Sequence, residues 1–184
     1  MERKQFLQQT ALLTAFIGIS KFTKANSKSN PIQPFVVGKG KSRKGRNQFF
    51  KGKHPNDVKI SGKDTNQQLA VFEYIGYDKI GPSLHIHLEQ EEIFFVAEGT
   101  YRFKVGDELK ELGPGDTIFL PRNIAHTWIQ TSDYGRLLYA VTPAGKLEDF
   151  FDTMENLKAP PTQAEVDKIH AEHGMKLVGP GLTL

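Results

Sequence analysis

Three histidines and a glutamate in the middle of the sequence have the side chains and the spacing of a metal site. His85 and His87 are two residues apart, and residues two apart on a strand point to the same face of a sheet. A charged turn follows, after which a hairpin return would bring Glu92 back beside both imidazoles. His126 follows a turn-forming segment and would approach them from another strand. These four side chains are predicted to bind one metal ion.

The donor types restrict the metal. Imidazole nitrogens with one carboxylate suit Fe, Mn, Ni, Co or Zn as divalent ions, whereas Ca²⁺ and Mg²⁺ prefer sites built from oxygen alone. The sequence has no cysteine, which excludes thiolate ligands and disulfides. A six-coordinate ion with these ligands keeps open positions for a substrate, so the predicted site is catalytic rather than structural.

Short strands are the elements that must position these donors. From residue 69 onward, apolar runs alternate with clusters of glycine, proline and aspartate, a pattern typical of an antiparallel sandwich or barrel. Tight turns are predicted at 106–107 and 113–116. The sequence therefore predicts an all-β fold with strands at 69–75, 83–88, 92–97, 100–105, 108–112, 117–120, 126–130 and 136–141.

The pattern becomes helical after residue 143. Four apolar side chains recur there at helical spacing and predict an amphipathic helix over 146–156: Leu147, Phe150, Phe151 and Met154. A second helix should begin after Thr162, which forms a capping box with Glu165, and end at Gly174. The apolar face of the first helix must be covered. We expect it to dock on the outer face of a sheet, at Ile93 and Phe95, or on a partner subunit in a homodimer.

The N-terminal segment resembles an export signal. Residues 1–25 have a basic start and an apolar stretch from Ala11 to Ile19, which is too short for a stable membrane anchor. Their surplus of positive charge equals the formal net charge of +3 of the whole chain. We expect a signal segment at 1–25, a polar linker at 26–34 and a periplasmic or secreted protein. The alternative is a cytoplasmic protein with an N-terminal arm.

The basic run and the other histidines are expected to take no part in the metal site. The basic run from Lys39 to Lys53 is expected to be a solvated loop or an edge strand, and no nucleic-acid partner is predicted. His54, His170 and His173 have no metal-ligand context. His170 and His173 share a helical face, and we expect them to be solvated or to interact with the end of the helix.

Two blocks of the sequence resemble the paired motifs of the cupin superfamily. The first block reads Lys79, His85, His87, Glu92 and Gly99, with Lys79 in place of the family's first glycine. The second block reads Gly115, Pro121, Asn123, His126 and Gln130, with Asn123 in place of a glycine and Gln130 in place of an asparagine. All ligand positions of the family are kept. The stretch from Leu69 to the C-terminus resembles the small single-domain cupins related to quercetin dioxygenases.

This resemblance has consequences for the fold and for the choice of ligands. It implies a double-stranded β-helix, the jelly-roll cupin barrel, over 35–145 with a C-terminal helical extension at 146–184. Asn123 can still adopt the left-handed backbone conformation of the glycine it replaces. Among the neighbouring carboxylates, the family spacing to Gly99 selects Glu92, and Glu91 remains the alternative ligand.

The implied activity is that of a metal-dependent dioxygenase acting on a small aromatic or enolic substrate. Glu92 or a metal-bound hydroxide would then remove a proton from the substrate. Alternatives are a metal-dependent isomerase or decarboxylase with the same ligands, and a non-enzymatic cupin that binds a small molecule. An apolar pocket is expected beside the metal. Its wall is predicted to consist of Phe72, Phe94, Tyr101, Phe103, Phe119, Trp128 and Tyr139.

Overall fold

The computed structural model describes residues 33–184. The predicted signal segment at 1–25 and most of the predicted linker at 26–34 lie outside the described residues. Among the helices of the described part, none combines the length and the apolar character that a bilayer span requires.

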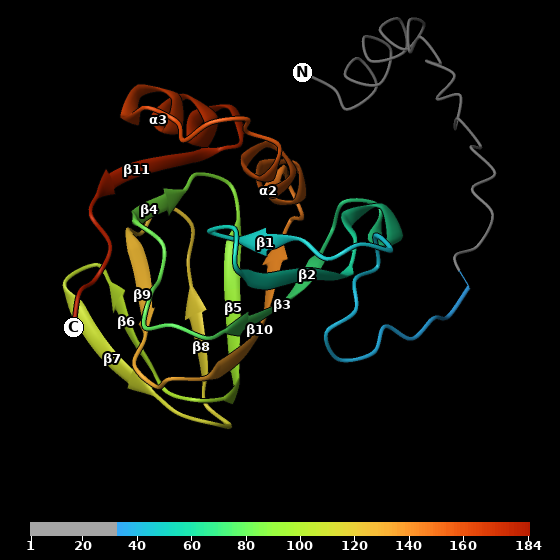
Figure 1. The fold of residues 1–184 in the computed structure, drawn as a ribbon, viewed down its shortest axis with the longest axis horizontal. Helices are drawn as coiled ribbons and strands as arrows, with labels where there is room; N and C mark the ends of the chain where they lie inside the picture. Colours follow the sequence, from blue (N-terminus) through green and yellow to red (C-terminus); the bar gives the residue numbers. More distant parts are fainter. Residues whose placement is uncertain (1–32) are drawn as a thin grey trace, which may run out of the picture. The chain divides into compact units, whose positions relative to one another are not determined.

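Two antiparallel sheets face each other around the core (Figure 1). The first has the order β1-β2-β3-β10-β5-β8, with bounds β1 (Phe49–Phe50), β2 (His54–Ile60), β3 (Ala70–Gly76), β10 (Gly135–Thr142), β5 (Glu91–Glu98) and β8 (Thr117–Leu120). The second has the order β11-β4-β9-β6-β7, with bounds β11 (Met175–Gly179), β4 (Leu84–His87), β9 (His126–Gln130), β6 (Tyr101–Val105) and β7 (Glu108–Leu112). This arrangement confirms the predicted all-β double-stranded β-helix.

Every predicted strand is present, but three strands were not predicted. β1 and β2 lie before residue 69, and β11 lies in the segment expected to be a helical extension. The pattern of β2 is obscured by Pro55 and Asp57, residue types that are rare in strands. Asp57 is nevertheless fully buried, because its carboxylate accepts hydrogen bonds from the backbone N–H of Gln48 at 3.1 Å and from Asn47 Nδ2 at 2.8 Å.

Strand alternation places aromatic side chains between the sheets. Phe94 on β5 stacks on Tyr139 of β10, and Tyr139 stacks on Phe72 of β3, with 4.9 Å between ring centroids in both pairs. Burying rings of this size is a major stabilising contribution in a domain of this length. At the turn before β9, Asn123 has a φ of 63° and so adopts the predicted left-handed conformation. Its backbone N–H donates to the carbonyl of His87 at 2.8 Å.

The two C-terminal helices are α2 (Leu147–Glu155) and α3 (Gln163–Glu172). The capping box of α3 is confirmed, since Thr162 accepts from the N–H of Glu165 and the Glu165 carboxylate accepts from the N–H of Thr162. A short 3₁₀ helix, η1 (Gly62–Thr65), has a capping box of the same kind.

The predicted docking of α2 on the outer face of a sheet is wrong. Phe95 on that face is 45% exposed, whereas Leu147 and Phe150 of α2 are buried and Phe151 meets the ring of Phe72 at 5.7 Å. α2 and α3 lie at one end of the barrel, beside β1 and β11 (Figure 1). The helix packs there because the inward-facing aromatic side chains offer it more apolar contact than the isolated outer residues do.

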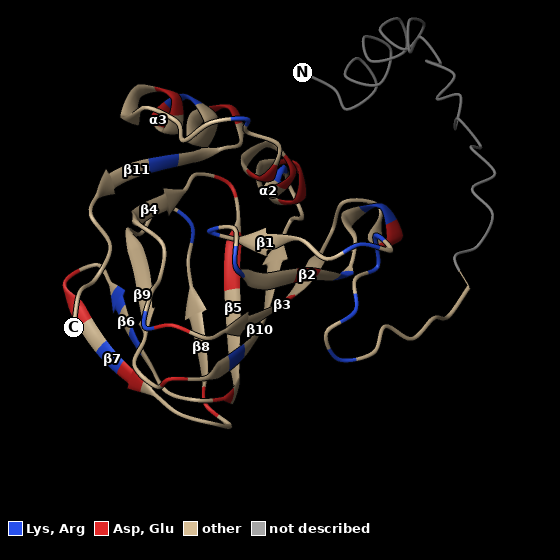
Figure 2. Cartoon of the chain, in the orientation of Figure 1, with Lys and Arg blue, Asp and Glu red and all other residues tan. Residues whose placement is uncertain are grey.

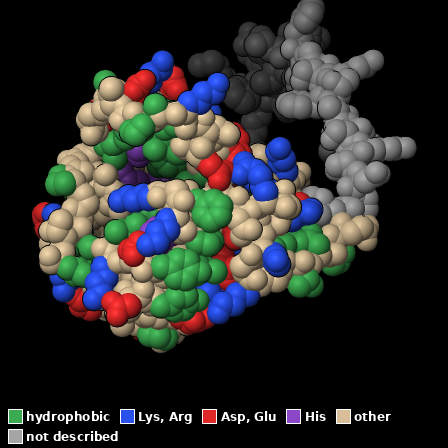
Figure 3. Space-filling model, viewed as in Figure 1, with side chains coloured by type: hydrophobic (Ala, Val, Ile, Leu, Met, Phe, Trp, Pro, Cys, Tyr) green, Lys and Arg blue, Asp and Glu red, His purple; other side chains and the backbone are tan. Residues whose placement is uncertain are grey.

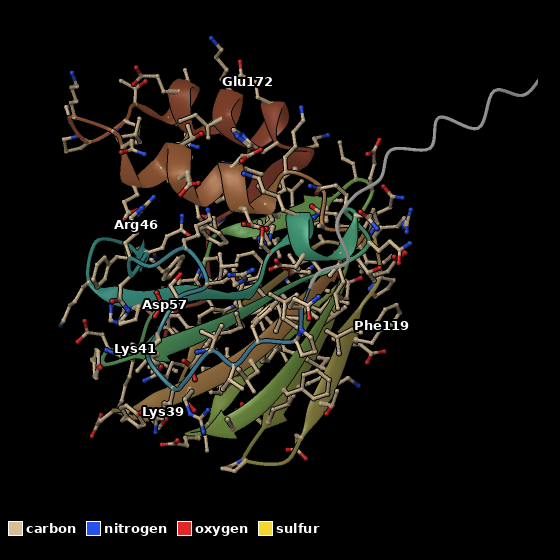
Figure 4. The ribbon with its side chains drawn as sticks, turned by 90° about the vertical axis from the view of Figure 1, so that its right-hand side faces the viewer. Lys39, Lys41, Arg46, Asp57, Phe119 and Glu172 are labelled. Atoms are coloured by element: carbon tan, nitrogen blue, oxygen red, sulfur yellow. The ribbon has the colours of Figure 1, made fainter. Side chains whose placement is uncertain are left out.

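The basic segment before β2 holds α2 through ion pairs. Lys44 Nζ lies 2.7 Å from Asp152, and Arg46 lies 2.8 Å from Asp152 and 2.5 Å from Glu155. Figure 4 shows Arg46 directly beneath the helices. The segment thus contains the edge strand β1, and part of its charge is neutralised by α2 (Figure 2).

Candidate metal centre

Four side chains from three strands bring their donor atoms together inside the barrel. His85 and His87 come from β4, His126 from β9 and Glu92 from β5, and one donor atom of each lies within 4.8 Å of the others. His85 and His126 are direct cross-strand partners. The expected hairpin between β4 and β5 is wrong, because these strands belong to different sheets. The turn at 88–90 instead carries the chain from one sheet to the other, so that Glu92 faces the histidines across the barrel.

Hydrogen bonds orient all three imidazoles in the same way. Nδ1 of His85 donates to the carbonyl of Ser83 at 2.8 Å, and Nδ1 of His126 donates to the carbonyl of Ile124 at 3.0 Å. Nδ1 of His87 donates to Oε1 of Gln90 at 3.1 Å. In each ring Nε2 is therefore left as the nitrogen that can bind a metal, and outer hydrogen bonds of this kind orient metal-binding histidines.

The carboxylate of Glu92 is buried among the imidazoles. Its Oε2 lies 3.1 Å from Nε2 of His126 and its Oε1 lies 3.7 Å from Nε2 of His87. Burial by itself would raise the pKa of Glu92, but the neighbouring histidines outweigh it and lower the pKa to about 2. The pKa of His85 falls to about 3, because burial and the charges of His126 and His87 disfavour its protonation. Neutral imidazole and ionised carboxylate are the forms that bind a cation.

The other glutamate considered as a ligand has a different role. Glu91 forms an ion pair with Arg122 and is not among the donors that cluster within residues 33–184. Of the two alternatives, the structure brings Glu92 to the histidines.

An apolar cavity of about 480 Å³ adjoins the donors. Side chains of the barrel, the β1–β2 hairpin and both helices form its wall. Figure 3 shows histidine side chains at the bottom of a hollow between hydrophobic side chains. The residues that contribute apolar surface beside the donors include Phe50, Phe94, Trp128, Tyr139, Leu147 and Phe150.

The predicted pocket residues fall into three groups. Phe94, Trp128 and Tyr139 line the cavity. A second group is fully buried in the core behind the wall, and it comprises Phe72, Tyr101 and Phe103. Phe119 is a correction, because its side chain is 56% exposed and points away from the barrel (Figure 4). The strand register explains this: Leu120 pairs with the inward-facing Glu92, so its neighbour Phe119 faces outward.

Several cavity residues were missed because they come from outside the two sequence blocks. Phe50 reaches the cavity from β1, where its ring lies 6.1 Å from that of Trp128. His170 lines it from α3, although a solvated or helix-end role was expected. Helical spacing had indicated the apolar face of α2 but could not show what that face covers. His54 is structural: it is buried, and its Nδ1 accepts from the N–H of Tyr77 at 3.2 Å.

The donor set fits a divalent transition metal. Three imidazole nitrogens and one carboxylate converge, each imidazole is oriented by a hydrogen bond at its second nitrogen, and the group adjoins a cavity rather than being closed on all sides. These four residues could hold one such ion.

Comparison with known proteins gives a domain and a fold. Residues 75–141 match the family model described as a cupin domain. The chain is similar to KdgF from Halomonas sp., with a TM-score of 0.52 and 14% identity over 61% of this chain and 94% of that one. It is also similar to an RmlC-like cupin from Shewanella frigidimarina, with a TM-score of 0.49 and 22% identity over 57% and 87% of the two chains.

A cupin-superfamily sugar phosphate isomerase from Silicibacter pomeroyi has a TM-score of 0.41 and 21% identity, over 47% of this chain and 59% of that one. The search of curated proteins found no match. The donor residues from His85 to His126 all lie inside the matched segment. Residues 75–141 thus match a cupin domain, and the barrel that contains them has the cupin fold.

Proposed function

We propose that this protein is a metal-dependent enzyme of the dioxygenase type that acts on a small, largely apolar substrate. The observation that carries the proposal is the position of the donor cluster at the wall of an apolar cavity. A structural metal site would be closed by its protein ligands, whereas a catalytic one keeps access for a substrate. The bound metal would supply Lewis-acid activation and a template for the substrate and dioxygen.

The residues around the donors support an aromatic or enolic substrate. Phe94, Trp128 and Tyr139 present ring faces and edges, and α2 adds Leu147 and Phe150. A cavity of about 480 Å³ lies within the range of sites for small organic molecules, about 300–1,000 Å³. Such walls exclude water and bind flat apolar molecules, while the donor cluster offers the polar interaction that orients them.

A second candidate is a metal-dependent isomerase or decarboxylase. The observation that favours it is the imidazole of His170 in the cavity, because moving a proton needs no dioxygen. A non-enzymatic role, in which the cavity only stores or senses a small molecule, would use the same walls.

Oxygen consumption separates these candidates. Metal-loaded protein should consume dioxygen when a flavonol is added in an oxygen electrode, and His126→Ala, which removes a donor, should not. Conversion of the flavonol at the same rate without dioxygen would contradict the dioxygenase proposal and favour the isomerase or decarboxylase. Binding without any conversion would favour the non-enzymatic role.

A further inference from the structure

The C-terminal helix α3 brings one histidine to the cavity that holds the metal donors. His170 is half-buried and lines the cavity together with His85, His87 and Glu92. It lies beyond residue 141, outside the segment that matches the cupin domain. Its position therefore depends on the packing of α2 and α3 and cannot be read from the cupin motifs.

The ring of His170 has a fixed orientation. Nδ1 donates to the carbonyl of Val166, one helical turn earlier, at 2.7 Å. The ring of Phe150 packs edge-on against it, with 4.7 Å between centroids. Nε2 has no hydrogen-bond partner among residues 33–184. Because Nδ1 carries the hydrogen, Nε2 of the neutral ring has a free lone pair and can accept a proton.

Burial favours the neutral form of His170. Its pKa is lowered, mainly by burial, and the charges of His87 and His173 lower it further, while the Val166 carbonyl and Asp167 oppose the shift. Glu155 of α2 lines the same cavity but is paired with Arg46. The carboxylate of Glu92 already interacts with two histidines, His126 at 3.1 Å and His87 at 3.7 Å, whereas Nε2 of His170 has no such partner in the described part of the chain.

We propose that His170 is a catalytic acid–base residue, which accepts a proton from the substrate in the cavity through Nε2. The proposal rests on the proposed function and extends it to a substrate class: molecules with an ionisable hydroxyl, or with a C–H next to a carbonyl. The O–H or C–H bond breaks, its electron pair stays on the substrate, and a new N–H bond forms at Nε2. The ring becomes an imidazolium whose Nδ1–H still donates to Val166.

His173 provides a matched control on the same helix end. Its Nδ1 donates to the carbonyl of Ile169 at 2.7 Å, in the same geometry as in His170, and its ring also packs against Phe150, at 5.8 Å. It does not line the cavity. Its Nε2 lies 3.5 Å from Thr153 Oγ1, so the two histidines differ in access to the cavity and in whether Nε2 has a partner.

Chemical labelling tests access without relying on turnover. Diethyl pyrocarbonate acylates accessible neutral imidazoles, and Zn²⁺ bound at the donor cluster would protect His85, His87 and His126. With the Zn²⁺-loaded protein, we expect a flavonol to slow labelling of His170 at least about tenfold and to leave His173 unchanged, as read by peptide mass spectrometry. Equal labelling of His170 with and without the flavonol would overturn the proposal.

Kinetics test the chemical role. We expect His170→Gln to lower kcat by about 10²–10⁴-fold with little change in KM or metal content, and added imidazole to restore part of the rate. His173→Gln should leave kcat unchanged. Undiminished oxygen consumption by His170→Gln would refute this inference and leave the proposed function intact. Anaerobic conversion that depends on His170 would refute the dioxygenase proposal and support the inference.

Discussion

The metal donors and the two helices that cover them are held by different kinds of contact. His85, His87, Glu92 and His126 lie on strands that are hydrogen-bonded in the sheets, and each imidazole has a second hydrogen bond. α2 and α3, which we call the lid, rest on apolar packing, and α2 also forms ion pairs with the loop before β1. We therefore expect that the lid can be perturbed, and substrates changed, without loss of the metal.

Removal of a donor should have the largest effect. His87→Ala deletes an imidazole that is 1% exposed and faces Glu92. Even loss of an outer partner of a metal ligand lowers affinity by about 10–100-fold, so we expect this variant to lose more than about 100-fold in titrations of metal-stripped protein with Zn²⁺. His173→Gln is the control and should bind as the unaltered protein does. If His87→Ala bound Zn²⁺ with unchanged affinity, His87 would not be a metal ligand.

The lid should contribute stability rather than metal affinity. Phe150→Ala leaves a cavity among Phe151, His170 and His173, and the loss of a buried phenylalanine costs about 3–5 kcal/mol of the free energy of unfolding. The control Phe119→Ala removes the same side chain from an exposed site and should cost less than about 0.5 kcal/mol. Denaturant titrations would measure both. If Phe150→Ala lost its metal while it remained fully folded, the lid and the metal donors would not be independent of each other.

Gln90 joins the two regions, since its Oε1 accepts from His87 and its Nε2 donates to the carbonyls of Pro143 and Ala144 just before α2. Gln90→Leu should lower metal affinity by about 10–100-fold, because His87 loses its orienting partner. Gln90→Glu keeps an acceptor for Nδ1 and should recover part of that affinity. Competition with a chromogenic chelator would measure it, and equal affinities for all three proteins would show that Gln90 does not orient His87.

The ion pairs of the lid should have the smallest effect. Arg46 is half-exposed, so its pairs with Asp152 and Glu155 are screened by solvent, and Arg46→Ala should cost less than about 1 kcal/mol. We expect Arg46→Ala to speed up hydrogen exchange in α2. Arg43→Ala should leave exchange in α2 unchanged, because the partner of Arg43 is Asp64 in η1. Exchange that rises equally in both variants would mean that Arg46 does not hold the lid.

The metal donors lie on strands, and they could be predicted from the sequence because strand alternation is a local periodicity. Each predicted strand from 69 to 141 is present, and alternation brings His85 and His87 to one face. Spacing alone could not reveal that β4 and β5 lie in different sheets, so the hairpin was predicted wrongly. Phe119 was misplaced for a similar reason: its face depends on the register of β8 against β5.

The lid could not be predicted because its position depends on contacts between distant segments. Helical spacing indicated the apolar face of α2, and the Thr162 capping box located the start of α3. The surface that this face covers was set by the open end of the barrel, which exists only after the sheets have formed. The position of His170 at the cavity follows from that packing, and no motif surrounds it in the sequence.

The four donors are inferred to bind one metal ion at the cavity wall. Elemental analysis of protein purified without chelators, or reconstituted and then dialysed, tests it most directly. We predict one divalent transition metal ion per chain, with loss of that ion in the variant that combines His85→Ala and His126→Ala. Protein that is folded yet retains no metal, or a double variant that retains the full amount, would contradict the account.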